Sequence, residues 1–427
     1  MSDELKPNEN AAETVKGAVE GAVKGAAKGT VEGADSQPTS PGRFATLTRD
    51  LFTGNALIPV LAVLASFLVG GILIALSSES VQSASSYFFA RPGDTFSAIW
   101  NSIFGAYDAL FRGSIYNYQA SNFGDGILSL TQTLAYATPI TIAGLGLAVA
   151  FRSGLFNIGG TGQIIAGAVG STIVALYLPI WPGPLHFLIA VLAGVIAGAL
   201  FGGFVGFLKA STGANEVIVT IMFNYVAVFL LHYSLTSWLK APLAVNPQSS
   251  PLPNDVLYPS LAGSAYPLHA GFIAMLLAVA GVWWLMNRSS VGFHFKALGH
   301  NPSASRVAGI NIGRTYFLVM AVSGALAGLA GTSQILGTEK YLGTGVAATY
   351  GFDAITVALL GRSNPMGVLA AGILFGGLRA GAVTMQANQN VPIDIVYVVQ
   401  SMIVLFIAAP PLVRSIFFMP KQKEVRA

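Results

Sequence analysis

Long apolar stretches alternate with short polar segments over most of this chain of 427 residues. Most of them match the roughly 17–25 residues with which a helix crosses a membrane. The pattern predicts an all-α, polytopic transmembrane helical bundle of about ten spans, or eight or nine if the shorter stretches do not cross. Broken or re-entrant helices are expected among them. The predicted spans are residues 56–77, 128–150, 158–178, 185–208, 216–235, 269–287, 315–335, 350–361, 365–383 and 393–413.

The composition agrees with a membrane protein. Hydrophobic residues make up 53% of the chain and charged residues only 9%, whereas a soluble domain carries roughly 25% charged residues. The chain has no cysteine, which leaves neither a disulfide framework nor a thiolate metal site. The net charge of +4 does not indicate nucleic-acid binding, because Lys and Arg gather in the cytoplasmic loops of membrane proteins.

The segments between the spans predict a topology. With the N-terminus in the cytoplasm, eleven Lys and Arg beyond residue 50 fall inside and five outside, as the positive-inside rule requires. Both termini are then cytoplasmic. The five outside are Arg91, Arg112, Lys240, Lys340 and Arg379.

The same topology divides the chain into segments. We expect residues 1–50 to be a disordered cytoplasmic tail rather than a membrane-surface helix, because a glycine in each four-residue repeat weakens a helix. Residues 51–420 form the transmembrane domain, with long external loops at 78–127 and 236–268. A second cytoplasmic tail covers residues 421–427.

Glycines recur every fourth residue in one predicted span. Gly194, Gly198, Gly202 and Gly206 fall on one helix face, where the absence of side chains lets two helix backbones approach closely. We interpret this face as a helix-packing surface.

Two glycine-rich segments interrupt the apolar pattern, FRSGLFNIGGTGQ at residues 151–163 and GTGVAATYGFDA at 343–354. Non-helical backbone at membrane depth is tolerated only where protein or water forms hydrogen bonds with its polar groups. Transporters place such breaks beside the substrate path. We therefore hypothesise that six residues line a translocation pathway, although their polar groups could instead only satisfy the backbone of the breaks. They are Phe156, Asn157, Thr161, Gln163, Asn224 and Asp353. Glu216 has either a gating role or a structural one at the positive end of a helix dipole.

A cytoplasmic segment, residues 288–314, contains the signals of a short capped helix. Asn301 is a good N-cap and Pro302 suits the first helical position. Gly309 can close the helix in the left-handed conformation. The segment is either a simple connector or a contact site for a partner.

Motifs of common enzymes are missing from the sequence. It contains no GxxxxGK[ST], HExxH, CxxC or GxSxG pattern, so we expect neither an enzyme, nor an ATP site, nor a metal site. Intramembrane acids are few, namely Glu216, Asp353 and Asp394, and an ion-coupled secondary transporter usually needs more.

Four motifs, in chain order over about residues 128–413, resemble the permeases of ATP-binding cassette (ABC) importers of the branched-chain amino acid and simple-sugar type. HNPSASRVAGINIGR at 300–314 is similar to their coupling helix. FRSGLFNIGGTGQ resembles the signature of the nucleoside branch, which is linked to basic-membrane-protein-type lipoproteins. ANEVIVTIMFNYVA at 214–227 and GFDAITVALLGRSNPMGVLAAGILFG at 351–376 resemble further segments of that branch. At Gly160-Thr161 the chain departs from the usual Ala-Glu, so the match does not fix the cargo.

The resemblance implies a permease subunit of the bacterial cytoplasmic membrane that translocates nucleosides by alternating access. Simple sugars or branched-chain amino acids are the alternative cargo, and an ion-coupled transporter is the alternative mechanism. The chain itself would hold no cofactor, because ATP-Mg binds the partner ATPase subunits. Further partners would be a second related permease or a second copy, an extracytoplasmic substrate-binding lipoprotein and membrane lipid, but no nucleic acid polymer. The ATPase-coupling residues would be Asn301, Pro302, Ser303, Ala304, Arg306, Gly309 and Asn311. Phe156 would stack on a base, and the amides of Asn157 and Gln163 would suit a neutral polar cargo.

Overall fold

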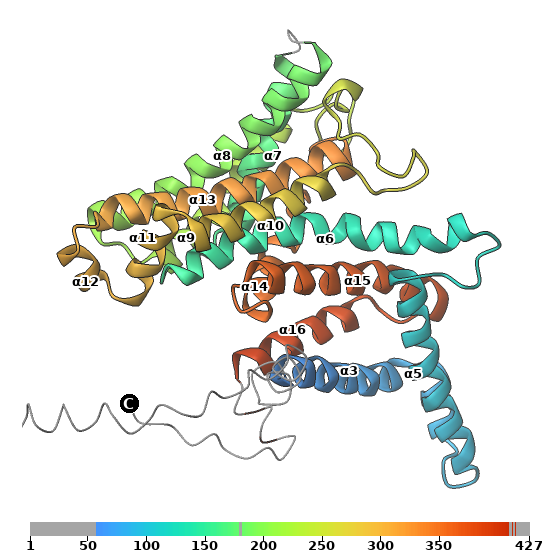
Figure 1. Cartoon of the computed structure of the whole chain (residues 1–427). Coiled ribbons are helices and arrows are strands. Elements are labelled where there is room, and N and C mark those ends of the chain that lie inside the picture. Colours follow the sequence, from blue (N-terminus) through green and yellow to red (C-terminus); the bar gives the residue numbers. More distant parts are fainter. Residues whose placement is uncertain (1–56, 179–181, 410–411, 413–414, 416–427) are drawn as a thin grey trace, which may run out of the picture. The chain divides into compact units, whose positions relative to one another are not determined.

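The computed structural model describes residues 57–178, 182–409, 412 and 415 (Figure 1). The expected tails at 1–50 and 421–427 lie outside these residues. Within the described part the chain is all-α and contains no β-strand. The fold class predicted from the apolar pattern is confirmed.

Among the residues that the structure describes, eight helices are long and apolar enough to cross a membrane, and two shorter apolar helices accompany them. Together they correspond one to one with the ten predicted spans. The long ones are α3 (Leu57–Ser77), α6 (Phe123–Arg152), α7 (Gly160–Tyr177), α8 (Gly183–Thr212), α9 (Glu216–Thr236), α10 (Gly271–Arg288), α13 (Ile312–Ser333, continued by the π-helix η2, Gln334–Glu339) and α15 (Pro365–Gln389). The short ones are α14 (Tyr350–Leu360) and α16 (Asp394–Ala408).

The expectation of a loop at residues 78–127 is wrong. This segment contains α4 (Glu79–Ser85) and α5 (Pro92–Ser114), and α5 packs against α15. The α5 sequence mixes apolar and polar residues, so it forms one apolar face rather than the continuous apolar run by which spans were recognised. Residues 237–270 agree better with a loop, because they hold only one short 3-10 helix, η1 (Asn254–Val256).

The core is built around α6, in whose most apolar stretch 83% of the residues are buried. Helices α10, α13, α14 and α15 surround it. By contrast, α3, α9 and α10 expose many large apolar side chains, such as Leu68, Phe229 and Leu277, as expected of helices that face lipid. The helix crossing the centre of the bundle is thus the one most fully covered by protein.

Helices α8 and α13 lie side by side, green and orange in Figure 1. The four glycines spaced by four residues on α8 are buried against α13. A Cβ atom on Gly198 would lie 2.3 Å from the carbonyl oxygen of Gly324 and 2.6 Å from the Cα atom of Gly328. The two backbones are therefore in direct contact, and a side chain at this position would force them apart.

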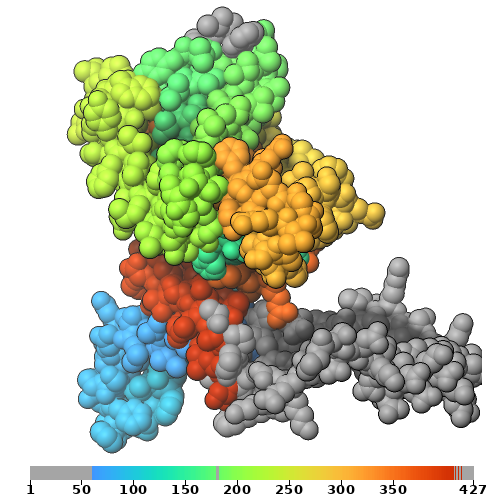
Figure 2. Space-filling view, turned by 90° about the vertical axis from the view of Figure 1, so that its left-hand side faces the viewer, coloured from blue at the N-terminus to red at the C-terminus, as the bar shows by residue number. Residues whose placement is uncertain are grey.

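Two further short helices follow α10, namely α11 (Ser290–His300) and α12 (Pro302–Val307). They lie at the end of the bundle where α8 ends and where α9 and α13 begin, on the left of Figure 1, and this end faces the viewer in Figure 2. The capping residues of α12 predicted that helix from the sequence, whereas α11 was not predicted.

Candidate functional site

The first glycine-rich break lies between the end of α6 and the start of α7. Asn157, at its centre, is fully buried. Its Oδ1 atom accepts a hydrogen bond from the Gly159 amide at 2.8 Å, and its Nδ2 atom donates to Ser323 Oγ at 2.9 Å and to Gln163 Oε1 at 3.1 Å. One asparagine therefore joins the break to α7 and to α13.

Helix α9 supplies hydrogen-bond partners for the backbone on the other side of the same break. Asn224 accepts from the Gly162 amide at 2.8 Å through Oδ1 and donates to the Ile158 carbonyl at 2.9 Å through Nδ2. The hydroxyl of Thr220, one turn earlier, accepts from the Ile158 amide at 3.3 Å. Thr220 is a further residue of this hydrogen-bond network that was not predicted from the sequence, although its spacing of four residues from Asn224 places both on one helix face.

These contacts agree with the alternative in which the polar side chains satisfy the exposed backbone of the break. Asn157 and Gln163 are buried and hydrogen-bonded to each other, so in this conformation neither faces solvent. A hydrogen-bonded buried network of this kind fixes one arrangement of the chain. Contact of these residues with cargo stays a prediction.

The two glycine-rich breaks meet in space. A Cβ atom on Gly351, at the start of α14, would lie 2.4 Å from the Thr161 amide nitrogen at the start of α7. Gly160 is also close to this contact, since a Cβ atom there would lie 3.3 Å from the Gly351 carbonyl oxygen. Thus Thr161, of the first segment, contacts Gly351, of the second, although the two are far apart in the sequence.

Asp353 belongs to a charged cluster inside the bundle. Its Oδ2 atom lies 3.5 Å from Arg379 Nη1 and accepts a hydrogen bond from Thr349 Oγ1 at 2.7 Å. The Arg379 guanidinium also lies over the rings of Tyr350 and Tyr136, at 4.3 and 5.5 Å from their centroids. The carboxylate is therefore paired, as an ionisable group at membrane depth requires.

Arg379 was counted among the residues on the outer side, although the predicted span at 365–383 contains it. Arg379 lies inside α15, which continues to Gln389. The predicted span also ended six residues before the helix does, at residue 383 rather than at Gln389. The missed signal was an arginine within a long helical stretch, which in a membrane protein indicates function by default.

Phe156 is the most exposed residue of the predicted pathway, at 45%. Its ring stacks on that of Phe151, with the centroids 4.7 Å apart. Its backbone amide is 3.4 Å from Glu216 Oε1, and Glu216 forms an ion pair of 2.6 Å with Lys209. Glu216 thus links the end of α8, the start of α9 and the break.

The short helix α12 has the cap expected from the sequence. Asn301 Oδ1 accepts from the amides of Ser303 and Ala304, at 2.9 and 3.1 Å. Gly309 adopts the left-handed conformation with a φ of 81°. Asn311 instead caps the next helix, α13, by accepting from the Arg314 amide at 2.9 Å.

Most of α12 is exposed: Pro302, Ser303, Ala304 and Arg306 face outward, and Val307 is 91% exposed. Val307 is a further residue that the sequence analysis missed. An exposed apolar side chain beside an exposed arginine, on a rigidly capped helix, is suited to contact with a protein partner.

Helix α11 joins α12 to the first break. A Cβ atom on Gly299 would lie 2.4 Å from the Arg152 carbonyl oxygen and 3.0 Å from the Gly154 amide nitrogen. Gly154 itself has a φ of 72°. Backbone therefore contacts backbone where α6 ends, and Gly299 lies only three residues before Pro302, where α12 begins.

His269 lies outside the spans, two residues before α10. Its Nδ1 atom accepts from the Gly271 amide at 3.1 Å, so Nε2 carries the proton and donates to Thr338 Oγ1 at 3.3 Å. Burial, with a smaller contribution from the nearby Lys340 cation, lowers the pKa of His269 from 6.5 to about 4. The imidazole is neutral at pH 7 and holds the start of α10 against η2.

The fold and the site together define a multi-pass helical membrane protein in which broken helices meet at the centre of the bundle, as in transporters. Residues 129–408 match the family described as branched-chain amino acid transport system / permease component. This match covers more than half of the chain, and the chain belongs to this permease family.

Several relatives are similar over most of their length. The chain is 34% identical to a guanosine ABC transporter permease protein of Bacillus subtilis, over 87% of this chain and 97% of the relative. It is 31% identical to a nucleoside ABC transporter permease protein of Lactococcus lactis, over 88% and 96%. It is also 31% identical to a glucose ABC transporter permease protein of Haloferax volcanii, over 82% and 86%.

Proposed function

We propose that this chain is the permease subunit of an ABC importer that carries nucleosides across the cytoplasmic membrane. The main observation behind the proposal is that the chain is 34% identical to the guanosine permease over 97% of that protein. The nucleoside permease of Lactococcus lactis, covered over 96% of its length, supports the same cargo.

The chain works with separate ATPase subunits, which bind ATP-Mg, and with an extracytoplasmic substrate-binding lipoprotein. Its second permease is a related chain rather than a second copy. Support comes from Bacillus subtilis and Lactococcus lactis, each of which has another permease of the same named cargo that is 24–25% identical to this chain. Both termini lie in the cytoplasm, with α12 on the same side, as the distribution of Lys and Arg indicates.

Transport proceeds by alternating access, driven through α12. When the ATPases close on ATP, they displace α12, and α11 transmits the displacement to the end of α6 through Gly299. A second route runs along α13, where Ser323 holds Asn157 by a hydrogen bond of 2.9 Å. Both routes reach the break between α6 and α7, which supports a role of that break as the moving part.

The test is uptake of radiolabelled guanosine, uridine and glucose in cells lacking this gene and in cells complemented with variants. Arg306→Ala and Gly309→Ala change the exposed charge and the left-handed closure of α12. Gly281→Ala is the control, because no atom lies within 4 Å of a Cβ at that position. We expect deletion to abolish nucleoside uptake, and only the control variant to restore it in full.

Each part of the proposal has its own refutation. Unchanged nucleoside uptake in the deletion strain refutes the cargo, and a loss of glucose uptake alone would assign the sugar role instead. That second candidate is favoured by the 31% identity to the glucose permease. Uptake that persists after ATP depletion but stops when the ion gradient is collapsed would refute the ABC mechanism.

A further inference from the structure

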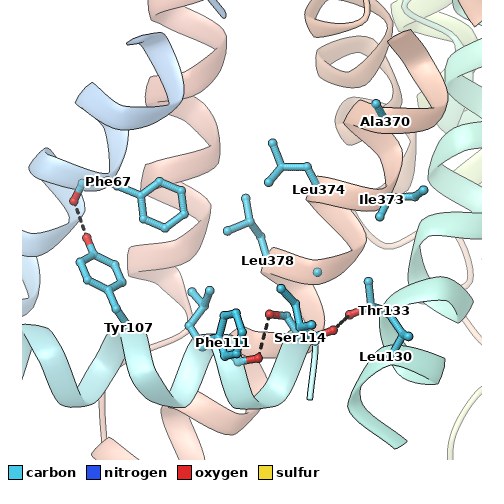
Figure 3. Close-up of a pocket in the computed structure, with 13 residues that line it drawn as sticks. Phe67, Tyr107, Phe111, Ser114, Leu130, Thr133, Ala370, Ile373, Leu374 and Leu378 are labelled. Atoms are coloured by element: carbon cyan, nitrogen blue, oxygen red, sulfur yellow. Dashed lines mark hydrogen bonds between the residues drawn. The ribbon is translucent and has the colours of Figure 1, made fainter. Parts of the chain in front are cut away.

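An apolar groove lies between α3, α5, α6 and α15, apart from the breaks and the charged cluster (Figure 3). Its larger section has a volume of about 700 Å³. Apolar side chains such as Phe67, Phe111, Leu374 and Leu378 line it. A second section of about 390 Å³ shares Ala370 and Leu374 with the first and continues past α3 to Leu360 and Gly367. We name the two sections together the α3–α15 groove.

The polar groups of the groove are already hydrogen-bonded within the protein, as the dashed lines in Figure 3 show. Tyr107 donates its hydroxyl to the Phe67 carbonyl. Thr133 donates to the Ser114 carbonyl at 2.5 Å, and Ser114 donates to the Phe111 carbonyl at 3.2 Å. A polar solute would lose its hydrogen bonds to water here without replacement. The groove therefore suits hydrocarbon and not the proposed cargo.

The dimensions of the groove fit one leaflet of a bilayer. Along α15 it extends from Gly367 to Leu378, which at 1.5 Å per residue is about 16 Å. The hydrocarbon core of a bilayer is about 30 Å thick, so one leaflet spans about 15 Å. On α3, Leu64 of the groove lining and the neighbouring Leu68 are both exposed apolar side chains, so lipid can enter the groove from the side.

A cationic residue lies at one end of the groove. Leu360 and Gly367 line that end, and the turn between α14 and α15 that connects them contains Arg362, which is exposed. Arg362 and Ser363 both have a positive φ, of 51° and 53°, and the turn is held by the Ser363 amide donating to the Ala358 carbonyl at 2.8 Å. An exposed guanidinium at the edge of a membrane attracts anionic headgroups, and it pairs with phosphate in a bidentate way.

We propose that the α3–α15 groove binds one anionic phospholipid, with an acyl chain between α3 and α15 and its phosphate on Arg362. The lipid occupies the space that α3, α5, α6 and α15 leave among them, about 700 Å³ in the larger section. The lining of the groove selects this occupant, because its apolar length matches an acyl chain and the cation at its end matches an anionic headgroup.

The test uses the full permease complex, purified in detergent and incubated with equal amounts of phosphatidylglycerol and phosphatidylethanolamine. Native mass spectrometry counts the phospholipid that each complex retains. In Ala370→Trp a large side chain fills the point shared by both sections, and since Ala370 is exposed it can do so without entering the core. We expect this variant to lose one lipid per chain, with at least a tenfold drop in the lipid-bound fraction, and Ala370→Leu to lose it in part.

Arg362→Gln tests the headgroup separately. It should still retain lipid, but its preference for phosphatidylglycerol over phosphatidylethanolamine should fall about fivefold, the contribution of one basic residue beside an anionic lipid. The matched controls are Ala280→Trp and Arg288→Gln, an exposed alanine and an exposed arginine of α10 that do not line the groove. Both should behave like the wild type.

Equal lipid retention in wild type and Ala370→Trp overturns the proposal, and so does an equal loss in Ala280→Trp. A protein occupant would also overturn it. Because the chain has no cysteine, Ala370→Cys carries a single thiol, which can be labelled with a short photo-crosslinker. Crosslinks to phospholipid support the proposal, whereas crosslinks to the second permease or to residues 1–56 show that protein fills the groove.

Discussion

Gly299→Ala tests the contact through which α12 is connected to the break. An ideal Cβ atom at this position lies 2.4 Å from the Arg152 carbonyl oxygen, and ordinary van der Waals contact begins at 3.4 Å. The end of α11 must therefore retreat from the end of α6 by about 1 Å. Both partners are backbone atoms, so no side-chain rotation can relieve the overlap. Overpacking of this kind costs typically about 1–3 kcal/mol.

We expect the variant to insert and assemble but to lose coupling. A cost of about 1–3 kcal/mol corresponds to roughly 5- to 150-fold in an equilibrium constant, so nucleoside uptake should fall by about tenfold or more at equal membrane levels. ATP hydrolysis by the complex should continue, but it should no longer rise when loaded binding protein is added. The assay is uptake in complemented cells together with ATPase activity of the reconstituted complex.

Gly281→Ala is the control, since its Cβ would meet no atom within 4 Å. It should transport as the wild type does. If Gly299→Ala also transports at the full rate and retains substrate-stimulated hydrolysis, α11 does not transmit the motion of α12. A loss of uptake accompanied by loss of the protein from the membrane would show that the contact serves folding instead.

Three further predictions concern the coupling helix, helix packing and pH. Asn301→Ala removes the cap of the six-residue helix α12, at a cost of about 1 kcal/mol, and should lower nucleoside uptake. Asn301→Ser keeps a capping side chain and should restore uptake. Equal uptake by the two variants would contradict the role of the cap. Gly198→Ala should lower the thermal unfolding midpoint of the purified complex by separating α8 from α13, because its Cβ would lie 2.3 Å from the Gly324 carbonyl oxygen; an unchanged midpoint would argue against the contact. The pKa of His269 is about 4 when folded and 6.5 in the reference state, so the unfolded chain binds more protons between these values and stability should fall by about 2 kcal/mol from pH 7 to pH 5. Unfolding measured at both pH values should show a smaller loss for His269→Gln, and an equal loss in both proteins would exclude this histidine as the cause.

Helix positions and helix caps could be predicted because their signals are local. Ten apolar stretches correspond to ten helices, since a span must satisfy its own backbone and its length is set by the bilayer. The cap of α12 needed only Asn301, Pro302 and Gly309 in the right order. Helix α5 was missed because a helix with one apolar face has no continuous apolar run.

The surroundings of the polar residues could not be predicted in the same way. Asn157 was a candidate from its place in a glycine-rich break, but its hydrogen bond to Ser323 joins residues 166 positions apart. Arg379 was counted on the outer side, and only the packing of α15 beside α14 brings it to Asp353. Spacing along the chain gives no distance between segments so far apart.

The sequence by itself determined the number and approximate limits of the apolar helices, the two breaks, the glycine face of α8 and the capped helix α12. Each depends on interactions within a few residues or within one helix. Tertiary structure alone decided that the breaks meet at Thr161 and Gly351, that Asn157 is buried, and that Gly299 touches the end of α6. It also decided that a hydrocarbon groove remains between α3 and α15. The physical reason is that these features arise where helices distant in sequence pack together, and each is fixed by the shape of both surfaces at once.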